Sequence, residues 1–210
     1  MIESGGYKMV DFKDAPQDGG LNWQNNCFKL ALQTLNDSFK DPTIIEIGTL
    51  RVGQGSSSDI FAWYVSKYGG KFRTCDINEK SIDTFMFEYV GDKGRSGDIL
   101  GINKDGIEYL RNFAPNPIHF LYLDSMDSEK GAQCFYSSLF NVFLFVEAQK
   151  SLCHNSLILI DDIIPGDIQI PINNESPNLG KGIFLIPYLL SQKKAFRCLK
   201  EGYQYLFQVI

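Results

Sequence analysis

Acidic side chains or glycines follow each of five short apolar runs in this chain of 210 residues. Short apolar runs bounded by turn residues predict buried strands. A glycine-rich loop follows the first run, and aspartates follow the later ones: Asp76, Asp105, Asp124 with Asp127, and Asp161 with Asp162. A single carboxylate at a strand end can be the cap of the next helix. Five such strand ends in succession predict instead a ligand site beyond the carboxyl ends of a sheet.

The glycine loop and the first of these aspartates form a pair. The stretch IIEIGTLRVGQGSSS (44–58) places Gly48, Gly53 and Gly55 directly after an apolar run. Glycine lets a ligand approach the backbone closely, although a plain strand-to-helix turn also favours it. Asp76 follows about 20 residues after this loop, at the end of the next predicted strand, where a carboxylate can accept hydrogen bonds from ribose hydroxyls. The pair predicts a cofactor that contains a nucleoside.

Two classes of cofactor compete for this site. The spacing of the three glycines departs from the GxGxxG pattern of nicotinamide dinucleotide sites. Glu46, inside the first apolar run, would also be a poor neighbour for a diphosphate. S-adenosylmethionine has no phosphate and carries a positive sulfonium, so an acid-rich pocket suits it better. The residues therefore favour S-adenosylmethionine over NAD.

Predicted strands alternate with predicted helices along the chain. The strands span residues 43–48, 71–77, 98–103, 118–124 and 156–162. The helices span residues 23–39, 56–68, 80–90, 106–113, 131–152 and 181–192. Residues 195–210 add two strands around a hairpin-like turn at 200–202. This order predicts an α/β fold with a parallel sheet covered on both faces, which finishes with an antiparallel strand.

Length and composition are those of a single globular domain. The net charge of −5 argues against a nucleic acid as partner, since phosphate binding needs a basic surface. No apolar run reaches the roughly 18 residues of a membrane span, and residues 1–16 show no signal-peptide pattern. We therefore expect a cytoplasmic protein with neither a nucleic acid nor a membrane as partner. The five scattered cysteines predict neither a disulfide framework nor a zinc site.

The motifs, taken in order, resemble class I S-adenosylmethionine-dependent methyltransferases. EIGTLRVGQGSSSDIFAWYVSKYGGKFRTCDIN resembles their first motif and their acidic second-strand motif. LYLDSMDSEKG and SLILIDD resemble a small-molecule O-methyltransferase subgroup with LDS after strand four and DD after strand five, and GKGIFLIPYLLSQ and EGYQYLFQV resemble its closing elements. The resemblance runs from about residue 40 to the C-terminus. It implies a Rossmann-like three-layer sandwich with a seven-stranded sheet in the order 3-2-1-4-5-7-6 and an antiparallel last strand. It also implies a methyltransferase domain at 41–210, with 1–40 as an arm and helix packed on it.

The resemblance implies a role for particular residues. Gly48 and the loop after it would wrap the methionine part of the cofactor, Asp76 would bind the ribose hydroxyls, and Asp105 would lie beside the adenine amino group. Lys104 stands where the family usually has glycine, and the loop from Thr49 to Ser56 is longer than the family's. The full set of implied cofactor-binding residues is Glu46, Gly48, Thr49, Gly53, Gly55, Ser56, Ser57, Asp76, Ile77, Asp105 and Asp124.

Asp124, Asp161 and Asp162 raise the question of a metal. Relatives of the catechol type use carboxylates after strands four and five to hold Mg²⁺, which suits hard oxygen ligands and would position a substrate hydroxyl. That type carries Asp-Asn after strand five, whereas this chain has two aspartates. The alternative is that one aspartate caps the next segment and the other faces solvent or the methyl donor. The sequence leaves both open.

The candidates for a catalytic base are Asp124, Asp127 and Lys130, from the loop after strand four. His119 lies inside a predicted strand, and His154 is expected to cap the long helix before it, so neither is a convincing base. The proline- and glycine-containing segment 163–182 is long enough to predict a lid over the acceptor, with a plain surface loop as the alternative.

The function expected from these features is S-adenosylmethionine-dependent methyl transfer to a small-molecule acceptor, at oxygen. A non-catalytic nucleotide- or cofactor-binding protein on the same fold is the main alternative, since fold does not settle function. An NAD-dependent oxidoreductase is disfavoured by the glycine spacing. The oligomeric state is left open, with a homodimer as one alternative.

Overall fold

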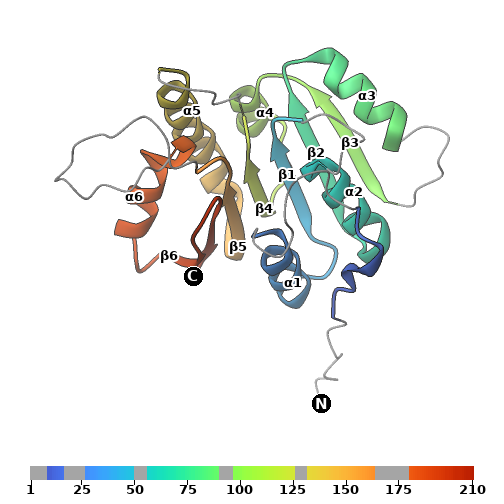
Figure 1. Ribbon diagram of the computed structural model, residues 1–210, viewed down its shortest axis with the longest axis horizontal. Coiled ribbons are helices and arrows are strands. Elements are labelled where there is room, and N and C mark those ends of the chain that lie inside the picture. The colour runs from blue at the N-terminus through green and yellow to red at the C-terminus, as the bar shows by residue number, and fades with distance from the viewer. Residues whose placement is uncertain (1–8, 17–26, 50–55, 90–96, 126–131, 164–179) are drawn as a thin grey trace.

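One mixed sheet organises the chain (Figure 1). The computed structural model describes residues 9–16, 27–49, 56–89, 97–125, 132–163 and 180–210. Its strands are β1 (Thr43–Ile47), β2 (Lys71–Asp76), β3 (Asp98–Asn103), β4 (Ile118–Leu123), β5 (Leu152–Ile160), β6 (Phe196–Lys200) and β7 (Tyr205–Val209). Its helices are α1 (Phe28–Ser38), α2 (Ser57–Tyr68), α3 (Glu79–Tyr89), α4 (Gly106–Asn112), α5 (Ala132–Ala148) and α6 (Leu185–Ser191), with short 3-10 turns η1 (Phe12–Asp14), η2 (Gln149–Ser151) and η3 (Gly180–Gly182).

The described strands form a seven-stranded sheet in the order β3-β2-β1-β4-β5-β7-β6. The pairs among β1 to β5 are parallel, and β7 runs antiparallel to both β5 and β6. The expected fold is therefore confirmed, including the strand order and the antiparallel last strand.

Helices cover both faces of the sheet (Figure 1). Helices α1, α2 and α3 share an apolar cluster with side chains such as Ile44, whereas α4, α5 and α6 share a second cluster with Ile45 and Ile47. Successive residues of β1 thus point to opposite faces, and every residue of the strand is buried. A strand buried on both faces explains the continuous apolar run. Each fully buried large apolar side chain contributes about 1.5–3 kcal/mol.

Local signals set the beginning of α2 and the turn before β2. The Ser56 hydroxyl accepts a hydrogen bond from the Asp59 backbone N–H, and the Asp59 carboxylate accepts one from the Ser56 N–H. This reciprocal capping box satisfies donors that the first helical turn leaves free. After the helix, Gly70 has φ +105, and a Cβ there would lie 2.4 Å from the Pro42 carbonyl oxygen. Glycine is therefore required where the chain returns to the sheet.

The end of α5 and the beginning of β5 differ from the expectation. Helix α5 ends at Ala148 and β5 begins at Leu152, whereas the sequence pattern predicted a helix to 152 and a strand from 156. Leu152 pairs with Ile118 of β4, and the register then shifts before the regular pairing from Leu157 onward. This early pairing is a contact between distant segments, so apolar periodicity does not reveal it. His154 accordingly lies in β5 and does not cap a helix.

The predicted helix at 181–192 begins later than expected. Residues 180–182 form η3, and α6 begins at Leu185. Pro187 then falls in the first turn of α6, where a backbone N–H has no partner within the helix, so proline costs no intrahelical hydrogen bond. The position of Pro187 therefore explains why α6 begins at Leu185 and not at residue 181.

The N-terminal part of the described chain packs on α1 and α2. The Val10 N–H donates to the Gln33 side chain at 3.0 Å, and the Asp11 N–H donates to the Tyr68 hydroxyl oxygen at 2.7 Å. Helix α1 buries Phe28 and Leu32 in the same cluster as α2. The division at residue 40 into an arm and a methyltransferase domain stays a prediction. In the described part of the chain, no helix combines the length and the apolar character that a membrane crossing needs.

Candidate active site

The carboxyl ends of β1, β2, β4 and β5 meet at one edge of the sheet because these strands are parallel neighbours. The chain leaves β1 toward α2 on one face and leaves β4 toward α5 on the opposite face. The strand order thus reverses between β1 and β4, and open α/β sheets bind ligands at such a switch point. The predicted site residues that the structure describes gather in two groups along this edge.

The first group lies at the ends of β1 and β2. The Thr49 backbone N–H donates to Asp76 Oδ2 at 2.8 Å, and the Asn78 N–H donates to Oδ1 at 2.7 Å. The Thr49 hydroxyl lies 2.6 Å from that of Thr74, which fixes the turn against β2. The Asp76 carboxylate is partly exposed. It is held by backbone donors on both oxygens at the point where the sequence predicted a ribose contact.

The backbone conformation and the packing at position 48 require a glycine, whether or not a ligand binds there. Its φ is +99, and a Cβ there would lie 2.3 Å from the carbonyl oxygen of Asp124. The turn after β1 therefore packs directly on the backbone at the end of β4, and any larger residue would force the two strands apart. The predicted contact of Gly48 with a cofactor stays a prediction.

Glu46 is fully buried inside β1. The hydroxyls of Ser57 and Ser58 each donate to one of its carboxylate oxygens at 2.5 Å. Burial raises the pKa of Glu46 to about 7, against the lowering effect of the serine hydrogen bonds. Glu46 thus ties the beginning of α2 to β1. Its own contact with a cofactor, and those of Ser56 and Ser57, stay predictions.

The predicted adenine side of the site lies after β2 and β3. Asp105 Oδ1 accepts a hydrogen bond from the Glu108 N–H at 3.0 Å, so this aspartate caps α4. Ile77 is 80% exposed. The Asn103 side-chain amide donates to the backbone carbonyls of Asp76 and Ile77 and holds this turn. Sequence reasoning missed Asn103, whose position at the end of β3 is its only signal.

The second group lies at the ends of β4 and β5. Asp124 and Asp161 are both buried, and Asp162 follows with φ +52, a left-handed conformation that aspartate adopts more readily than most residues. The ammonium of Lys181, in η3, lies 2.8 Å from Asp124 Oδ1 and 2.7 Å from Asp162 Oδ2. Its side chain is 2% exposed. Two of the three aspartates predicted as metal ligands therefore pair with a lysine that sequence reasoning did not single out.

Two tyrosines complete this group. The Tyr122 hydroxyl donates to Asp161 Oδ2, and the Tyr203 hydroxyl donates to Asp162 Oδ1. The other Asp161 oxygen accepts the Asp162 N–H at 2.7 Å. Tyr122 lies 39 positions before Asp161, and Tyr203 lies 41 positions after Asp162, so no local pattern could have indicated these two contacts.

Burial dominates the ionisation of this group. Burial, followed by the charge of Asp161, raises the pKa of Asp124 well above its ordinary range, although Lys181 acts against it. Burial and the charge of Asp162 likewise raise the pKa of Asp161. Burial alone would lower the pKa of Lys181, but Asp124 and Asp162 hold it above its usual value. The lysine is therefore a permanent cation among acids.

The carboxylates as they stand do not fit a divalent metal. Lys181 engages Asp124 and Asp162, while both oxygens of Asp161 are used by Tyr122 and the Asp162 N–H. Within the described ranges, no group of three or more histidine, cysteine, aspartate or glutamate residues is arranged to hold a metal ion. The Mg²⁺ site at Asp124, Asp161 and Asp162, which the sequence left open, is therefore not supported, because a buried ammonium lies between Asp124 and Asp162.

Other predicted residues lie outside the described part of the chain. They are Gly53, Gly55, Asp127, Lys130 and most of the predicted lid, 164–179. His119 is described, and its Nδ1 accepts the Thr43 N–H at 2.8 Å. It is structural, as its place in a strand predicted.

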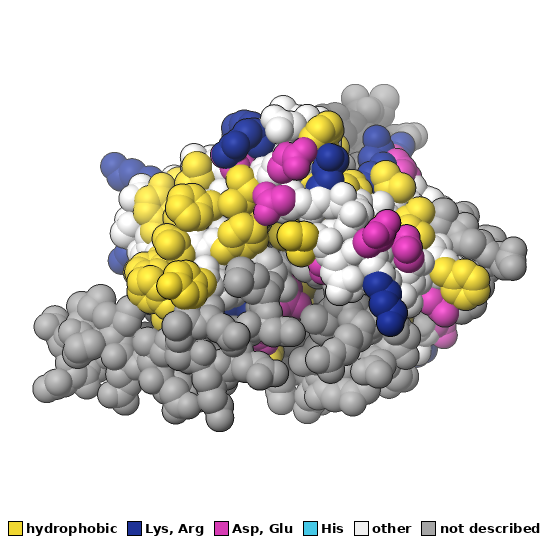
Figure 2. Space-filling view, turned by 90° about the horizontal axis from the view of Figure 1, so that it is seen from above, with side chains coloured by type: hydrophobic (Ala, Val, Ile, Leu, Met, Phe, Trp, Pro, Cys, Tyr) yellow, Lys and Arg dark blue, Asp and Glu magenta, His cyan; other side chains and the backbone are white. Residues whose placement is uncertain are grey.

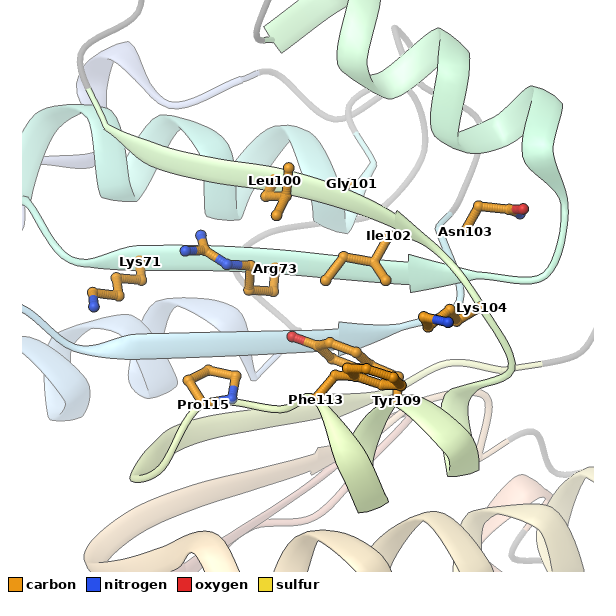
Figure 3. Close-up of a pocket in the computed structure, with 10 residues that line it drawn as sticks. All are labelled: Lys71, Arg73, Leu100, Gly101, Ile102, Asn103, Lys104, Tyr109, Phe113 and Pro115. Atoms are coloured by element: carbon orange, nitrogen blue, oxygen red, sulfur yellow. The ribbon is translucent and has the colours of Figure 1, made fainter.

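A groove of about 530 Å³ runs along β2, β3 and α4 (Figure 3). Apolar side chains such as Ile102, Tyr109 and Phe113 line it together with Lys71 and Arg73. None of the predicted site residues that the structure describes lines this groove, although Asn103, which holds the turn after Asp76, does.

Apolar side chains also gather on the α5 side of the molecule (Figure 2). Helix α5 exposes an apolar stripe that consists of Phe135, Tyr136, Leu139, Phe143 and Val146. Whether a second copy of the chain covers this stripe is untested, and a homodimer stays one alternative.

Comparison with known proteins supports the fold. An O-methyltransferase from Bacillus cereus, solved in complex with S-adenosylhomocysteine (SAH), aligns over 93% of this chain and 84% of its own, at 17% identity and a TM-score of 0.57. The O-methyltransferase TomG from Streptomyces achromogenes, in complex with S-adenosylmethionine, aligns over 87% and 77%, at 15% identity and a TM-score of 0.55. An rRNA methylase from Streptococcus thermophilus aligns over 88% and 97%, at 13% identity and a TM-score of 0.54.

This likeness shows a fold shared with solved methyltransferases. No protein-family model and no curated protein matches the sequence.

Proposed function

We propose that this chain is an S-adenosylmethionine-dependent methyltransferase that methylates a small molecule at oxygen. The observation that carries the proposal is the placement of Asp76. Its carboxylate is oriented by two backbone N–H groups at the carboxyl end of β2, beside the Gly48–Thr49 turn. A carboxylate has about four acceptor positions, so two hydrogen bonds leave capacity for the two hydroxyls of a ribose.

The charge at this edge supports a cationic cofactor. Asp76 belongs to the first group, and three aspartates against the single ammonium of Lys181 make up the second. An excess of negative charge attracts a sulfonium and repels a diphosphate. Solved proteins of the same fold carry SAH or S-adenosylmethionine, which agrees with this choice over NAD.

Methyl transfer asks mainly for positioning, because the sulfonium is already activated. The acceptor oxygen forms a bond to the methyl carbon as the carbon–sulfur bond breaks, and the bonding electrons leave with sulfur to give SAH. The acceptor proton passes to a base. Asp124 is the described candidate, because it directly follows β4 at the edge of the sheet where the cofactor is proposed to bind. Asp127 and Lys130 stay proposed alternatives.

The acceptor is proposed to be small because the net charge of −5 disfavours a polyanion. Two solved proteins of this fold are O-methyltransferases by name, which supports oxygen as the acceptor atom. An rRNA methylase shares the fold as well, so RNA belongs in the test as a competing acceptor.

Calorimetry with SAH and with NAD tests the cofactor. We expect SAH to bind, NAD not to bind, and Asp76→Ala to weaken SAH binding. Binding of NAD in place of SAH would overturn the proposal. A screen of phenols, amines, hydroxy acids and RNA with methyl-labelled S-adenosylmethionine then tests turnover. SAH binding without turnover on any acceptor would favour a non-catalytic cofactor-binding protein.

A further inference from the structure

The ends of β4 and β5 carry their own cation. The Nζ atom of Lys181 lies 2.8 Å from Asp124 Oδ1 and 2.7 Å from Asp162 Oδ2. Distances of about 2.7–2.9 Å are those of an ammonium hydrogen-bonded to a carboxylate. A Mg²⁺ or Ca²⁺ ion bridging the same two carboxylates would have to stand in nearly the same place, at about 2.0–2.6 Å from each oxygen.

The backbone around Lys181 is held on two sides. Its N–H donates to the Asp162 carbonyl at 3.3 Å, and its carbonyl accepts a hydrogen bond from the buried Asn141 amide at 3.2 Å. Next to it, a Cβ on Gly182 would lie 2.1 Å from Ile186 Cδ1, so α6 packs closely on this turn. The segment that carries Lys181 is therefore held by α5, by Asp162 after the end of β5, and by α6. The ammonium is built into the fold and does not arrive as an exposed surface side chain.

The charges explain why a cation is needed here. Asp124 and Asp161 are buried, and Asp162 follows directly. Without a neutralising partner, this concentration of carboxylates in a low-dielectric region would be strongly unfavourable. One ammonium within reach of two of the carboxylates relieves part of that repulsion. A metal ion added to the same place would meet the positive charge of Lys181 at contact distance.

We propose that the Lys181 ammonium occupies the position of a divalent metal between Asp124 and Asp162, so that methyl transfer by this chain requires no metal. The inference rests on the proposed function for its statement about catalysis. Its structural part, that Lys181 excludes a divalent cation, holds independently of any cofactor. It follows that removing the lysine turns the same carboxylates into a cation site.

Titration with Mn²⁺, followed by the paramagnetic resonance signal of the free ion, tests the exclusion directly. The wild-type chain is expected to leave the Mn²⁺ signal unchanged, and Lys181→Ala to bind Mn²⁺ at least about tenfold more tightly than wild type, in the range of weak carboxylate sites. The double variant Lys181→Ala/Asp124→Asn, which removes one ligand charge, should lose most of that binding. Lys181→Arg, which keeps a cation, should behave like wild type.

Two results would overturn the proposal. One is Mn²⁺ binding by wild type that Asp124→Asn abolishes. The other is a folded Lys181→Ala that binds Mn²⁺ no better than wild type. If Lys181→Ala does not fold, Lys181→Met, which removes the charge and keeps most of the side-chain volume, takes its place in the titration with the same expected result.

Turnover in excess EDTA tests the statement about catalysis. We expect the rate of the wild-type chain to be unchanged, and loss of activity that Mg²⁺ restores would overturn this part. Failure of the proposed function would be seen separately, as absence of SAH binding in calorimetry, while the Mn²⁺ titrations would keep their meaning.

Discussion

The two acidic groups at the carboxyl edge are held in different ways. At the ends of β1 and β2, Asp76 is partly exposed and accepts hydrogen bonds from the backbone of Thr49 and Asn78. At the ends of β4 and β5, Asp124 and Asp162 pair instead with the buried side chain of Lys181. The first group thus has open acceptor capacity, whereas the second is already neutralised in part by the protein.

This difference separates ligand binding from stability. A carboxylate held by backbone donors keeps its place without a charged partner, and its free lone pairs can serve a ligand. A buried ion pair is costly to break, because removing one partner leaves an uncompensated charge. We therefore expect changes in the first group to alter cofactor affinity and changes in the second to alter the free energy of unfolding.

The largest effect is expected at Lys181. Lys181→Met keeps most of the side-chain volume and removes the charge, which should lower the free energy of unfolding by about 3–5 kcal/mol. The matched control is Lys67→Met, which removes a pair with the exposed Asp14 at 3.3 Å and should lower the free energy of unfolding far less, because solvent screens an exposed ion pair. Urea denaturation measures both. Equal losses for the two variants would contradict the distinction between a buried and an exposed pair.

The next effect concerns Glu46 and pH. Its pKa is raised from 4.5 to about 7 by burial, so its contribution to stability is present below pH 4.5 and is lost as the pH rises through 7. Between pH 4.5 and pH 7, the free energy of unfolding of Glu46→Gln should therefore rise by about 3 kcal/mol relative to that of wild type.

Denaturation at pH 5 and at pH 8 measures this change, with Glu108→Gln as a substitution at an exposed position. If the free energies of unfolding of Glu46→Gln and wild type differed by the same amount at both pH values, the raised pKa of Glu46 would be contradicted. The expected result would limit the comparison, because it would show that Glu46, a buried acid of β1 beside the first group, also governs stability.

Asp76 should show the opposite behaviour from Lys181. Asp76→Asn removes the charge that would accept the ribose hydroxyls, and we expect SAH affinity to fall by about 10- to 100-fold, or ~1.4–2.8 kcal/mol. Calorimetry measures the affinity, and denaturation should show only a small loss of stability. Asp98→Asn is the control, since Asp98 pairs with Arg73 at the opposite end of the sheet. Equal loss of affinity in both variants would remove Asp76 from the site.

The smallest effect separates two roles of Asp105. Asp105→Ala removes the cap of α4 and should cost about 1 kcal/mol of stability. Asp105→Ser keeps a capping oxygen but loses the carboxylate, so it should retain stability. If Asp105 also contacts adenine, as predicted, the serine variant should bind SAH about three- to tenfold more weakly. Unchanged affinity would leave Asp105 as a helix cap alone.

Much of the fold was predictable because its signals are local. The strand at 98–103 has the predicted bounds, and the cap at Ser56 marks the beginning of α2. The boundary between α5 and β5 was predicted wrongly, because Leu152 joins the sheet through a contact with Ile118. Of the candidate site, the positions of the strand-end acids could be predicted, since each acid directly follows an apolar run.

The partners of those acids could not be predicted. A lysine between two glycines is a weak signal, and Lys181 lies 57 positions after Asp124. Nothing in its neighbours indicates that it becomes buried. Mg²⁺ therefore stayed one alternative at carboxylates of which two pair with a lysine of the folded chain.

The sequence by itself determined the alternation of strands and helices, and with it the edge of the sheet where the acids lie, because apolar periodicity and capping act over a few residues. Only the tertiary structure decided which acids meet. Strand order places β4 beside β5, η3 then brings Lys181 between Asp124 and Asp162, and Gly48 closes on the Asp124 backbone. These contacts join residues that lie far apart in the chain, so no local sequence pattern predicts them. Because Lys181, Asp124 and Asp161 are buried, their charges must be compensated within the protein.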